Sequence, residues 1–133
     1  MEFSGAVWFD AQLGELWFPY VDATLRNGEY VTPCRLLVDS GTHITLLPLH
    51  LGLALGLRKD SDEPISGTAV GGANVLFRLR RVRLRIGNHE IAARVGWLLD
   101  DSTEALLGRL DVFDAFHFDF RQSERTLIVT PTR

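Results

Sequence analysis

The chain of 133 residues is predicted to form a single, mostly β domain with one or two short helices. Most of the sequence consists of short apolar segments separated by turn signals, a pattern typical of all-β folds. Hydrophobic residues make up 46% and charged residues 23%, which is the balance of a globular domain that buries its own core. Neither a repeat nor a linker divides the sequence, so we treat residues 1–133 as one domain.

Apolar patterning and turn residues define the elements of the first half. Residues 18–26 alternate loosely between apolar and polar and are predicted to form a strand. Asn27-Gly28 follows, and this pair favours a two-residue hairpin because both residues tolerate a positive φ. The next strand, residues 29–38, ends in three consecutive apolar residues, which predicts burial on both faces. Residues 47–57 are the first helix candidate, since Pro48 suits a first helical turn.

The second half contains further turn signals and a second helix candidate. Three glycines within residues 65–74 predict a mobile turn or a hairpin tip. The apolar positions of residues 77–86 change phase at Arg80-Arg81, which predicts a β-bulge there or a strand that passes from one sheet to another. The remaining predictions are a turn at Gly87-Asn88, a return strand over residues 90–99, a helix within residues 104–116 that begins near Gly108, and a hairpin of residues 117–120 and 126–130.

Charge and composition argue against several classes of function. The formal net charge is -3, whereas proteins that coat nucleic acids are normally basic. The most apolar stretch, residues 44–57, is shorter than the roughly 20 residues that a membrane helix needs, and Pro48 interrupts it. The N-terminus lacks the positive segment of a signal peptide, and the single cysteine, Cys34, fits a reducing compartment. We therefore expect a cytoplasmic protein with no nucleic-acid or membrane partner.

The segment with the clearest chemistry follows the predicted buried strand. Asp39 stands at the end of that strand, where a carboxylate is costly unless it is hydrogen-bonded or functional. Donors are supplied locally by the Ser40 hydroxyl, the Gly41 N–H and the Thr42 hydroxyl. Asp39 is therefore the candidate functional carboxylate, with the next three residues as its supports.

Residues 36–48, which contain Asp39-Ser40-Gly41, resemble the active-site signature of aspartic proteases, and the rest of the chain is similar to their single-domain, retroviral-like (retropepsin-type) branch. In that branch the signature leads to a threonine with an apolar-apolar-Pro step, a Leu-Gly-Leu segment, a glycine-rich flap and a late apolar-apolar-Gly-Arg motif. These motifs stand here in the family's order at Thr45 and Leu46-Leu47-Pro48, Leu55-Gly56-Leu57, residues 67–74 and Leu106-Leu107-Gly108-Arg109. Residues 1–16 form an N-terminal extension to which the family assigns no role.

The resemblance implies a closed β-barrel that pairs as a two-fold homodimer and hydrolyses peptide bonds in extended peptide or protein substrates, without a metal or cofactor. Asp39 would be the catalytic residue. Ser40 would brace both active-site loops across the dimer, Gly41 would donate its N–H to the carboxylate, and Thr42 would donate its hydroxyl to the outer carboxylate oxygen. His43 departs from the acidic residues that viral enzymes often have nearby, so substrate contacts at this loop are not carried over.

Three further roles come from the same resemblance. Val70, Gly71 and Gly72 would belong to the flap that closes over the substrate. Gly108 would allow close packing beneath the catalytic loop, with Arg109 completing the motif. The terminal strands, including residues 126–130, would interleave at the dimer interface.

Aspartic proteolysis needs two carboxyl groups on one water molecule, and together they share a proton. The sequence contains one Asp-Ser-Gly, and Asp101-Ser102-Thr103 lacks the glycine. The dyad would therefore be formed by Asp39 of two chains across a two-fold axis. Because each donor favours the ionised carboxylate, an acidic range of activity is expected.

Other interpretations remain open at this point. The fold could be a catalytically silent, dimerising β module that binds extended peptides, or a β-barrel without a peptide site. Cys34 could be a nucleophile with His43 or His50 as its base, although an inert buried thiol is favoured. The four histidines have no metal-ligand spacing, and the arginines of residues 78–85 fit a solvated strand face better than a phosphate site.

Overall fold

The computed structural model describes residues 1–60, 62–68 and 74–133, and most of them lie in β-strands. The elements, in chain order, are β1 (Glu2–Phe3), β2 (Ala6–Asp10), β3 (Gly14–Phe18), β4 (Tyr20–Asn27), β5 (Tyr30–Val38), β6 (Thr45–Leu47), α1 (Leu49–Ala54), β7 (Ile65–Thr68), β8 (Asn74–Ile86), β9 (His89–Leu98), β10 (Leu106–Leu107), β11 (Phe116–Arg121), the 3-10 helix η1 (Gln122–Glu124) and β12 (Thr126–Pro131).

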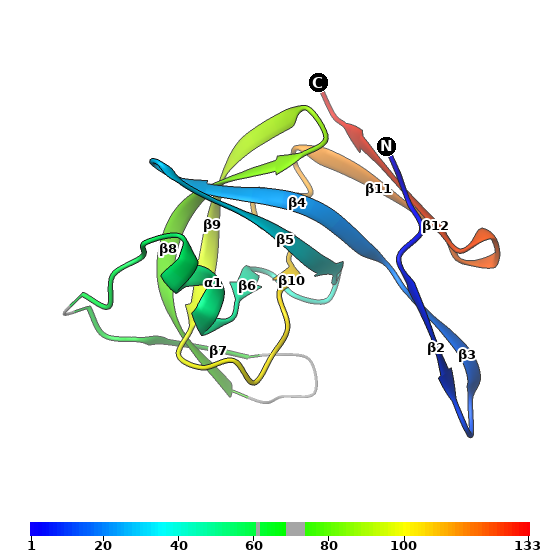
Figure 1. Ribbon diagram of the computed structural model, residues 1–133, viewed down its shortest axis with the longest axis horizontal. Helices are drawn as coiled ribbons and strands as arrows, with labels where there is room; N and C mark the ends of the chain where they lie inside the picture. Colours follow the sequence, from blue (N-terminus) through cyan, green and yellow to red (C-terminus); the bar gives the residue numbers. More distant parts are fainter. Residues whose placement is uncertain (61, 69–73) are drawn as a thin grey trace.

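The main sheet closes into a barrel. Its strands are paired in the order β4, β5, β10, β6, β9 and β8, and β8 then pairs with β4 to complete the ring (Figure 1). β7 extends this sheet by pairing with the start of β8. The mostly β fold with a closed barrel and a short helix agrees with the fold expected from the sequence.

Alternating apolar residues fill the barrel and hold it together. From Val21 to Leu25 in β4 and from Val82 to Ile86 in β8 every second residue is buried, because side chains of a strand point alternately to its two faces. Leu36 from β5, Val95 from β9 and Leu107 from β10 are completely buried in the same cluster. The core also reaches the second sheet, since Leu127 and Val129 of β12 are buried with them.

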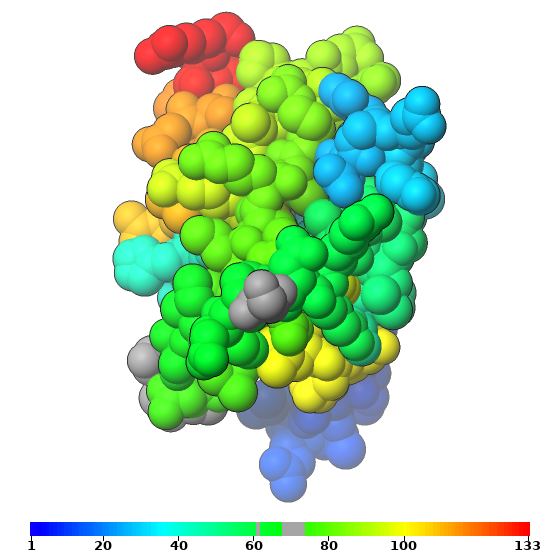
Figure 2. Space-filling model, turned by 90° about the vertical axis from the view of Figure 1, so that its left-hand side faces the viewer, coloured from blue at the N-terminus to red at the C-terminus, as the bar shows by residue number. Residues whose placement is uncertain are grey.

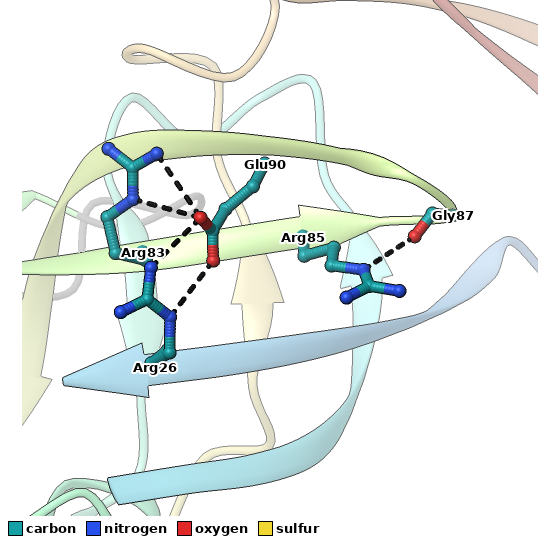
Figure 3. A network of polar contacts seen from close by, with 5 residues as sticks. All are labelled: Arg26, Arg83, Arg85, Gly87 and Glu90. Carbon is teal, nitrogen blue, oxygen red and sulfur yellow. Dashed lines mark hydrogen bonds and ion pairs between the residues drawn. The ribbon is translucent and has the colours of Figure 1, made fainter. Parts of the chain in front are cut away.

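Ion pairs join the strands where the barrel closes. Glu90 of β9 accepts hydrogen bonds from Arg26 of β4 at 3.0 Å and Arg83 of β8 at 3.3 Å, while Arg85 donates to the Gly87 carbonyl (Figure 3). Arg80 is paired with Asp62 at 2.9 Å. Because these arginines have acceptors within the chain, the contacts favour a solvated strand face over a phosphate site.

Two smaller β structures lie outside the barrel. β12 pairs with β11 on one side and with β1 on the other, which makes a three-stranded sheet from both ends of the chain. β2 and β3 form a two-stranded hairpin that extends away from the body of the molecule (Figure 1). Residues 127 and 128 of β12 thus have neighbours on both sides, so the expected interleaving of β12 with a partner's strand is not available there; the sheet edges are β1 and β11.

The predicted hairpins are confirmed. β4 and β5 form the first hairpin, but its two turn residues are Gly28 and Glu29, one position later than predicted, because Asn27 pairs with Tyr30; Gly28 has a φ of +60°. β8 and β9 join at Gly87-Asn88 as predicted. β11 and β12 form the last hairpin. The helix predicted over residues 47–57 is present but shorter, since α1 covers Leu49–Ala54 and Leu47 belongs to β6.

Two local predictions are wrong. The pairing of β8 with β9 is continuous from Phe77 to Ile86, so there is no bulge at Arg80-Arg81. The alternative prediction, a strand that passes from one sheet to another, is right about a change of neighbour but not about a change of sheet: β8 passes from β7 to β4 within the same sheet, and its apolar residues face a small cluster at one end and the barrel core at the other. The second predicted helix, within residues 104–116, is replaced by β10 and a series of turns, in which Asp111 has a φ of +67° that interrupts helical geometry.

Candidate active site

Asp39 lies where β5 leaves the barrel, and the backbone around it is fixed by long-range hydrogen bonds. The Asp39 N–H donates to the carbonyl of Leu107 at 3.0 Å, and the Val38 N–H donates to the carbonyl of Pro19 at 3.0 Å. Leu36 and Val38 are buried, whereas Leu37 is half-buried, so the end of this strand is enclosed largely as predicted. The side chain of Asp39 itself is half-buried at the surface.

Both carboxylate oxygens of Asp39 accept hydrogen bonds from the turn that follows. The Gly41 N–H donates to Oδ1 at 2.9 Å, and the Thr42 hydroxyl donates to Oδ2 at 2.8 Å. The Thr42 N–H also closes the turn by donating to the Asp39 carbonyl at 3.2 Å. Donors at both oxygens fix the orientation of the carboxylate.

Residues 107–110 support this turn from below. The Arg109 N–H donates to the Thr42 carbonyl at 3.0 Å, and the Leu110 N–H donates to the His43 carbonyl at 2.7 Å. Leu106 pairs with Leu37 of β5 on one side and with Leu46 of β6 on the other. The segment before the turn and the segment after it are therefore bound to the same short strand.

Gly108 permits the close approach of these segments. A Cβ atom at this position would lie 2.4 Å from the carbonyl carbon of Ile44 and 2.6 Å from its oxygen. The Gly108 N–H donates to the hydroxyl of Thr45 at 3.0 Å, and Thr45 is completely buried. A side chain larger than hydrogen at position 108 would separate residues 107–110 from the loop that contains Asp39.

An apolar pocket opens beside the loop. It has a volume of about 350 Å³ and begins at Thr42, whose hydroxyl is bonded to Asp39. Its walls come from the loop, from β6 and from the β7–β8 hairpin, and they consist of Thr42, His43, Ile44, Leu46, Ile65, Gly67, Val75, Phe77 and Leu79. The arrangement places a largely apolar surface next to a fixed carboxylate.

The predicted site residues are only partly brought together by the structure. Asp39, Gly41 and Thr42 are in contact, Ser40 is exposed on the outside of the turn, and Gly108 with the backbone of Arg109 lies beneath it. The Arg109 side chain is exposed and contributes to the loop through its backbone. Val70, Gly71 and Gly72 lie outside the described residues, whereas the adjoining β7 and β8 flank the pocket.

The pocket-lining residues of β7 and β8 were missed by the sequence reasoning, although a signal was present. Phe77 and Leu79 are the apolar residues on the far side of the phase change in residues 77–86. Apolar side chains on the face of a strand that does not point to the core indicate either a second cluster or a binding surface. Here they serve both, because Phe77 packs with Leu46 and Leu98 and also lines the pocket.

The structure gives no support to a cysteine nucleophile. Cys34 is buried, and burial raises the pKa of its thiol to about 12, which strongly disfavours the reactive thiolate. His50 is instead bonded to Asp101, with Nδ1 2.8 Å from Oδ1.

Within residues 1–60, 62–68 and 74–133, no three side chains of the types His, Cys, Asp and Glu are grouped so that they could hold a metal ion. In the same ranges, none of the helices has the length and apolar character required to cross a membrane.

A closed barrel with Asp-Ser-Gly at a strand end, supported by a Leu-Gly-Arg segment whose Leu107 and Gly108 are buried, defines the retropepsin-type class of aspartic protease folds. The aspartyl protease family model matches residues 21–109, which include both Asp39 and Gly108. The chain therefore belongs to the aspartyl protease family.

Solved structures show the same fold. The chain resembles a retropepsin-like aspartic protease from Rickettsia conorii with a TM-score of 0.65 and 18% identity, over 97% of this chain and 89% of that one. It also resembles EIAV protease, solved in complex with the inhibitor HBY-793, with a TM-score of 0.55 and 23% identity, over 69% of this chain and 82% of that one. No curated protein sequence matches the chain significantly. Family and fold together support aspartic protease activity.

Proposed function

We propose that the chain is an aspartic endopeptidase whose catalytic dyad consists of Asp39 from two copies of the chain. The observation that carries this proposal is the Asp39 carboxylate, which is held by the Gly41 N–H and the Thr42 hydroxyl at the edge of an apolar pocket. A carboxylate that served only to cap a turn would not require a pocket beside it or a second layer of hydrogen bonds beneath it.

A second copy supplies what a single chain lacks. The sequence contains one Asp-Ser-Gly; the other Asp-Ser pairs, Asp60-Ser61 and Asp101-Ser102, lack the glycine, and Asp101 lies beside His50. Ser40 and Gly41 are exposed at the outer surface of the loop, where a symmetry-related loop can approach. Two carboxyl groups that meet there share one proton, because both cannot be ionised at about 3 Å.

The shared proton gives the two carboxyl groups different roles. The ionised carboxylate removes a proton from a water molecule while the oxygen of that water forms a bond to the carbonyl carbon of the scissile peptide. At the same time the protonated carboxyl group donates its proton to the carbonyl oxygen. The tetrahedral intermediate then collapses: its C–N bond breaks, the amine nitrogen takes up a proton and the carboxylic acid product forms. The hydrogen bonds from Gly41 and Thr42 keep each carboxylate in position through both steps.

The pocket indicates what the substrate presents to the site. Ile44, Leu46 and Phe77 make its wall apolar, and a volume of about 350 Å³ accommodates a large side chain. Burial of such a side chain contributes roughly 1.5–3 kcal/mol to binding. We infer that the enzyme prefers a large aliphatic or aromatic residue near the scissile bond.

The test is cleavage of a diverse peptide mixture between about pH 3 and pH 7, with wild type compared with Asp39→Asn. Loss of the dyad is expected to reduce kcat/KM by about 10⁴-fold or more, since the neutral amide cannot act as the base. Wild-type cleavage should follow a bell-shaped pH profile, and the cleavage sites should be enriched in large apolar residues. Asp101→Asn, at the exposed Asp-Ser pair, is the control and should cleave at the wild-type rate.

Two results would contradict the proposal. If Asp39→Asn cleaved as fast as wild type, Asp39 would not be the catalytic group. If a protein shown to be dimeric bound the peptides without cleaving them, the chain would be a peptide-binding module with the same fold.

A further inference from the structure

The β2–β3 hairpin, residues 6–18, is an arm whose role the barrel does not explain. Its strands pair from Ala6–Phe18 to Asp10–Gly14, and its turn is closed by the Asp10 carboxylate, which accepts from the N–H groups of Gln12 and Leu13 at 2.8 Å. Figure 1 shows the arm extending from the body, and in Figure 2, seen at a right angle, its blue residues again project beyond the barrel. The arm is therefore well formed but largely without neighbours.

The arm exposes large apolar side chains on both of its faces. Val7 and Phe9, which share one face, are 46% and 82% exposed, and Trp8 on the other face is 54% exposed. Leu13 at the tip is 73% exposed. A two-stranded hairpin alone is marginally stable in water, and a cluster of exposed apolar residues of this kind marks a contact surface.

The root of the arm is attached beside the catalytic loop. The Trp17 indole donates to the Ser4 carbonyl at 2.8 Å, and the Arg35 guanidinium donates to the Gly5 carbonyl at 3.0 Å. Pro19, directly after β3, accepts from the N–H of Val38, the residue before Asp39.

We propose that the arm packs against a second copy of this chain in the dimer that assembles the Asp39 dyad. The inference rests on the proposed function, because that function requires a two-fold axis beside Asp39. Pro19 at the root of the arm is hydrogen-bonded to Val38, the residue before Asp39, so the arm starts close to the position that this axis would occupy.

The surface area that a stable dimer must bury also favours a second copy of this chain as the partner of the arm. A stable interface buries roughly 800 Å² on each partner, with an apolar centre. The loop alone presents Ser40 and Gly41 at its surface, which are too small and polar to provide it. Two arms related by the two-fold axis add the apolar residues of the arm twice, once from each copy.

The charges of the arm disfavour other occupants. Its only ionisable residues are Asp10 and Glu15, both acidic. An acidic arm is repelled by the anionic surfaces of membranes and nucleic acids. Glu15 lies 3.3 Å from Arg125 in the turn between β11 and β12, which holds the arm toward the sheet formed by the two chain ends.

The test measures dimerisation of the full chain by sedimentation equilibrium, together with peptide cleavage over a range of protein concentrations. The variants are Val7→Glu combined with Phe9→Glu, and the matched control is Val31→Glu. Val31 is 57% exposed, comparable to Val7, but lies at the end of β5 remote from Asp39. The arm variant should raise the dimer dissociation constant by about 100-fold or more, because each substitution acts twice in the dimer. Val31→Glu should leave it within about twofold.

Hydrogen exchange of the unsubstituted protein provides a measurement that does not depend on the folding of a variant. Amides of residues 6–18 should become more protected as concentration rises through the dimer range, while amides of the barrel core stay constant. Cleavage by the arm variant should recover at high protein concentration, since the dyad itself is intact.

The outcomes separate this inference from the proposed function. If the arm variant dimerises as tightly as wild type, or if protection of residues 6–18 does not change with concentration, the arm does not form the interface and the proposed dyad is unaffected. If wild type dimerises through the arm but does not cleave peptides, the inference is supported and the proposed activity fails. If wild type is monomeric at every concentration, both fail.

Discussion

The catalytic loop and the β2–β3 arm are neighbours in the structure, but they are held in opposite ways. The loop is bound on every side: Asp39 by Gly41 and Thr42, and the backbone of residues 42–43 by residues 109–110. The arm is bound at its root and by one exposed ion pair, Glu15 with Arg125, and Phe9 near its tip is 82% exposed. The difference teaches that the hydrogen bonds that orient Asp39 are complete within one chain, whereas the arm has apolar surface that the described residues of that chain leave exposed.

This contrast has a physical reason. A carboxylate that must be oriented within a few tenths of an ångström needs donors whose own positions are fixed, and the barrel supplies them. An arm that binds another copy of the chain, as proposed, needs exposed apolar surface instead, and this surface is stabilised only when the second copy buries it. The loop is therefore expected to be sensitive to substitutions inside the chain, and the arm to protein concentration.

The largest effect is expected from Gly108→Ala, which breaks the support of the loop. Its Cβ would lie 2.4 Å from the backbone of Ile44, and a backbone atom cannot move aside as a side chain can. We expect a loss of about 3–5 kcal/mol in the free energy of unfolding, together with loss of cleavage. Urea denaturation followed by circular dichroism measures the stability.

Gly67→Ala is the control for this substitution. A Cβ at Gly67 would meet the ring edge of Phe77 at 2.9 Å, and this side chain can adjust. Its effect should be about 1 kcal/mol or less. Equal stability of Gly108→Ala and wild type would show that the loop does not depend on this close approach.

Gly5→Ala breaks the root of the arm and should have an intermediate effect. Gly5 has a φ of +63°, and its Cβ would lie 2.2 Å from the Phe18 carbonyl oxygen. Gly28→Ala is matched in φ at +60° but has open space around the new methyl group. We expect Gly28→Ala to cost about 1 kcal/mol through backbone strain alone, and Gly5→Ala about 2 kcal/mol.

The two glycine variants should also differ in a second measurement. Sedimentation equilibrium should show a weaker dimer for Gly5→Ala and an unchanged dimer for Gly28→Ala. If Gly5→Ala dimerised as tightly as wild type, dimerisation would not depend on the geometry at the root of the arm.

The smallest effect concerns the turn beneath the loop and depends on pH. Asp111 accepts hydrogen bonds from the Arg94 side chain at 2.9 and 3.0 Å, and this guanidinium holds the pKa of Asp111 below the ordinary carboxyl value of 3.8, at about 2. Because the folded state has the lower pKa, the stabilisation is complete above about pH 4 and is lost as the pH falls toward 2.

Asp111→Asn tests this contribution, since asparagine also tolerates the positive φ of that position. At pH 7 the variant should lose about 1 kcal/mol, a value discounted for the solvent exposure of Arg94. The difference from wild type should narrow in denaturation curves recorded from pH 4 down to pH 2. Asp119→Asn, at a more exposed pair with Arg121, should have a smaller effect. If the difference in the free energy of unfolding between wild type and Asp111→Asn stayed constant with pH, the ion pair of Asp111 with Arg94 would not stabilise this turn.

Much of the fold was predictable because its signals are local. Gly28 and Gly87 each begin a two-residue turn with a φ of +60°, so the signal for each hairpin lies within the turn itself. The predicted bulge at Arg80-Arg81 failed for the opposite reason, since the face of β8 that is buried depends on whether β7 or β4 is its neighbour. The predicted helix after Gly108 failed because Arg94, from another strand, binds Asp111 in a conformation that a helix excludes.

The sequence by itself determined the chemistry of the loop: a carboxylate, Asp39, and the donors at Gly41 and Thr42 lie within four residues, so their hydrogen bonds follow from a single turn. Tertiary structure alone decided which residues line the pocket and support the loop from beneath. Those contacts join positions more than 20 and up to about 70 residues apart, and they form only when the barrel closes. It also decided that residues 6–18 stand away from the barrel, because a strand's neighbours are a property of the whole sheet rather than of its own sequence.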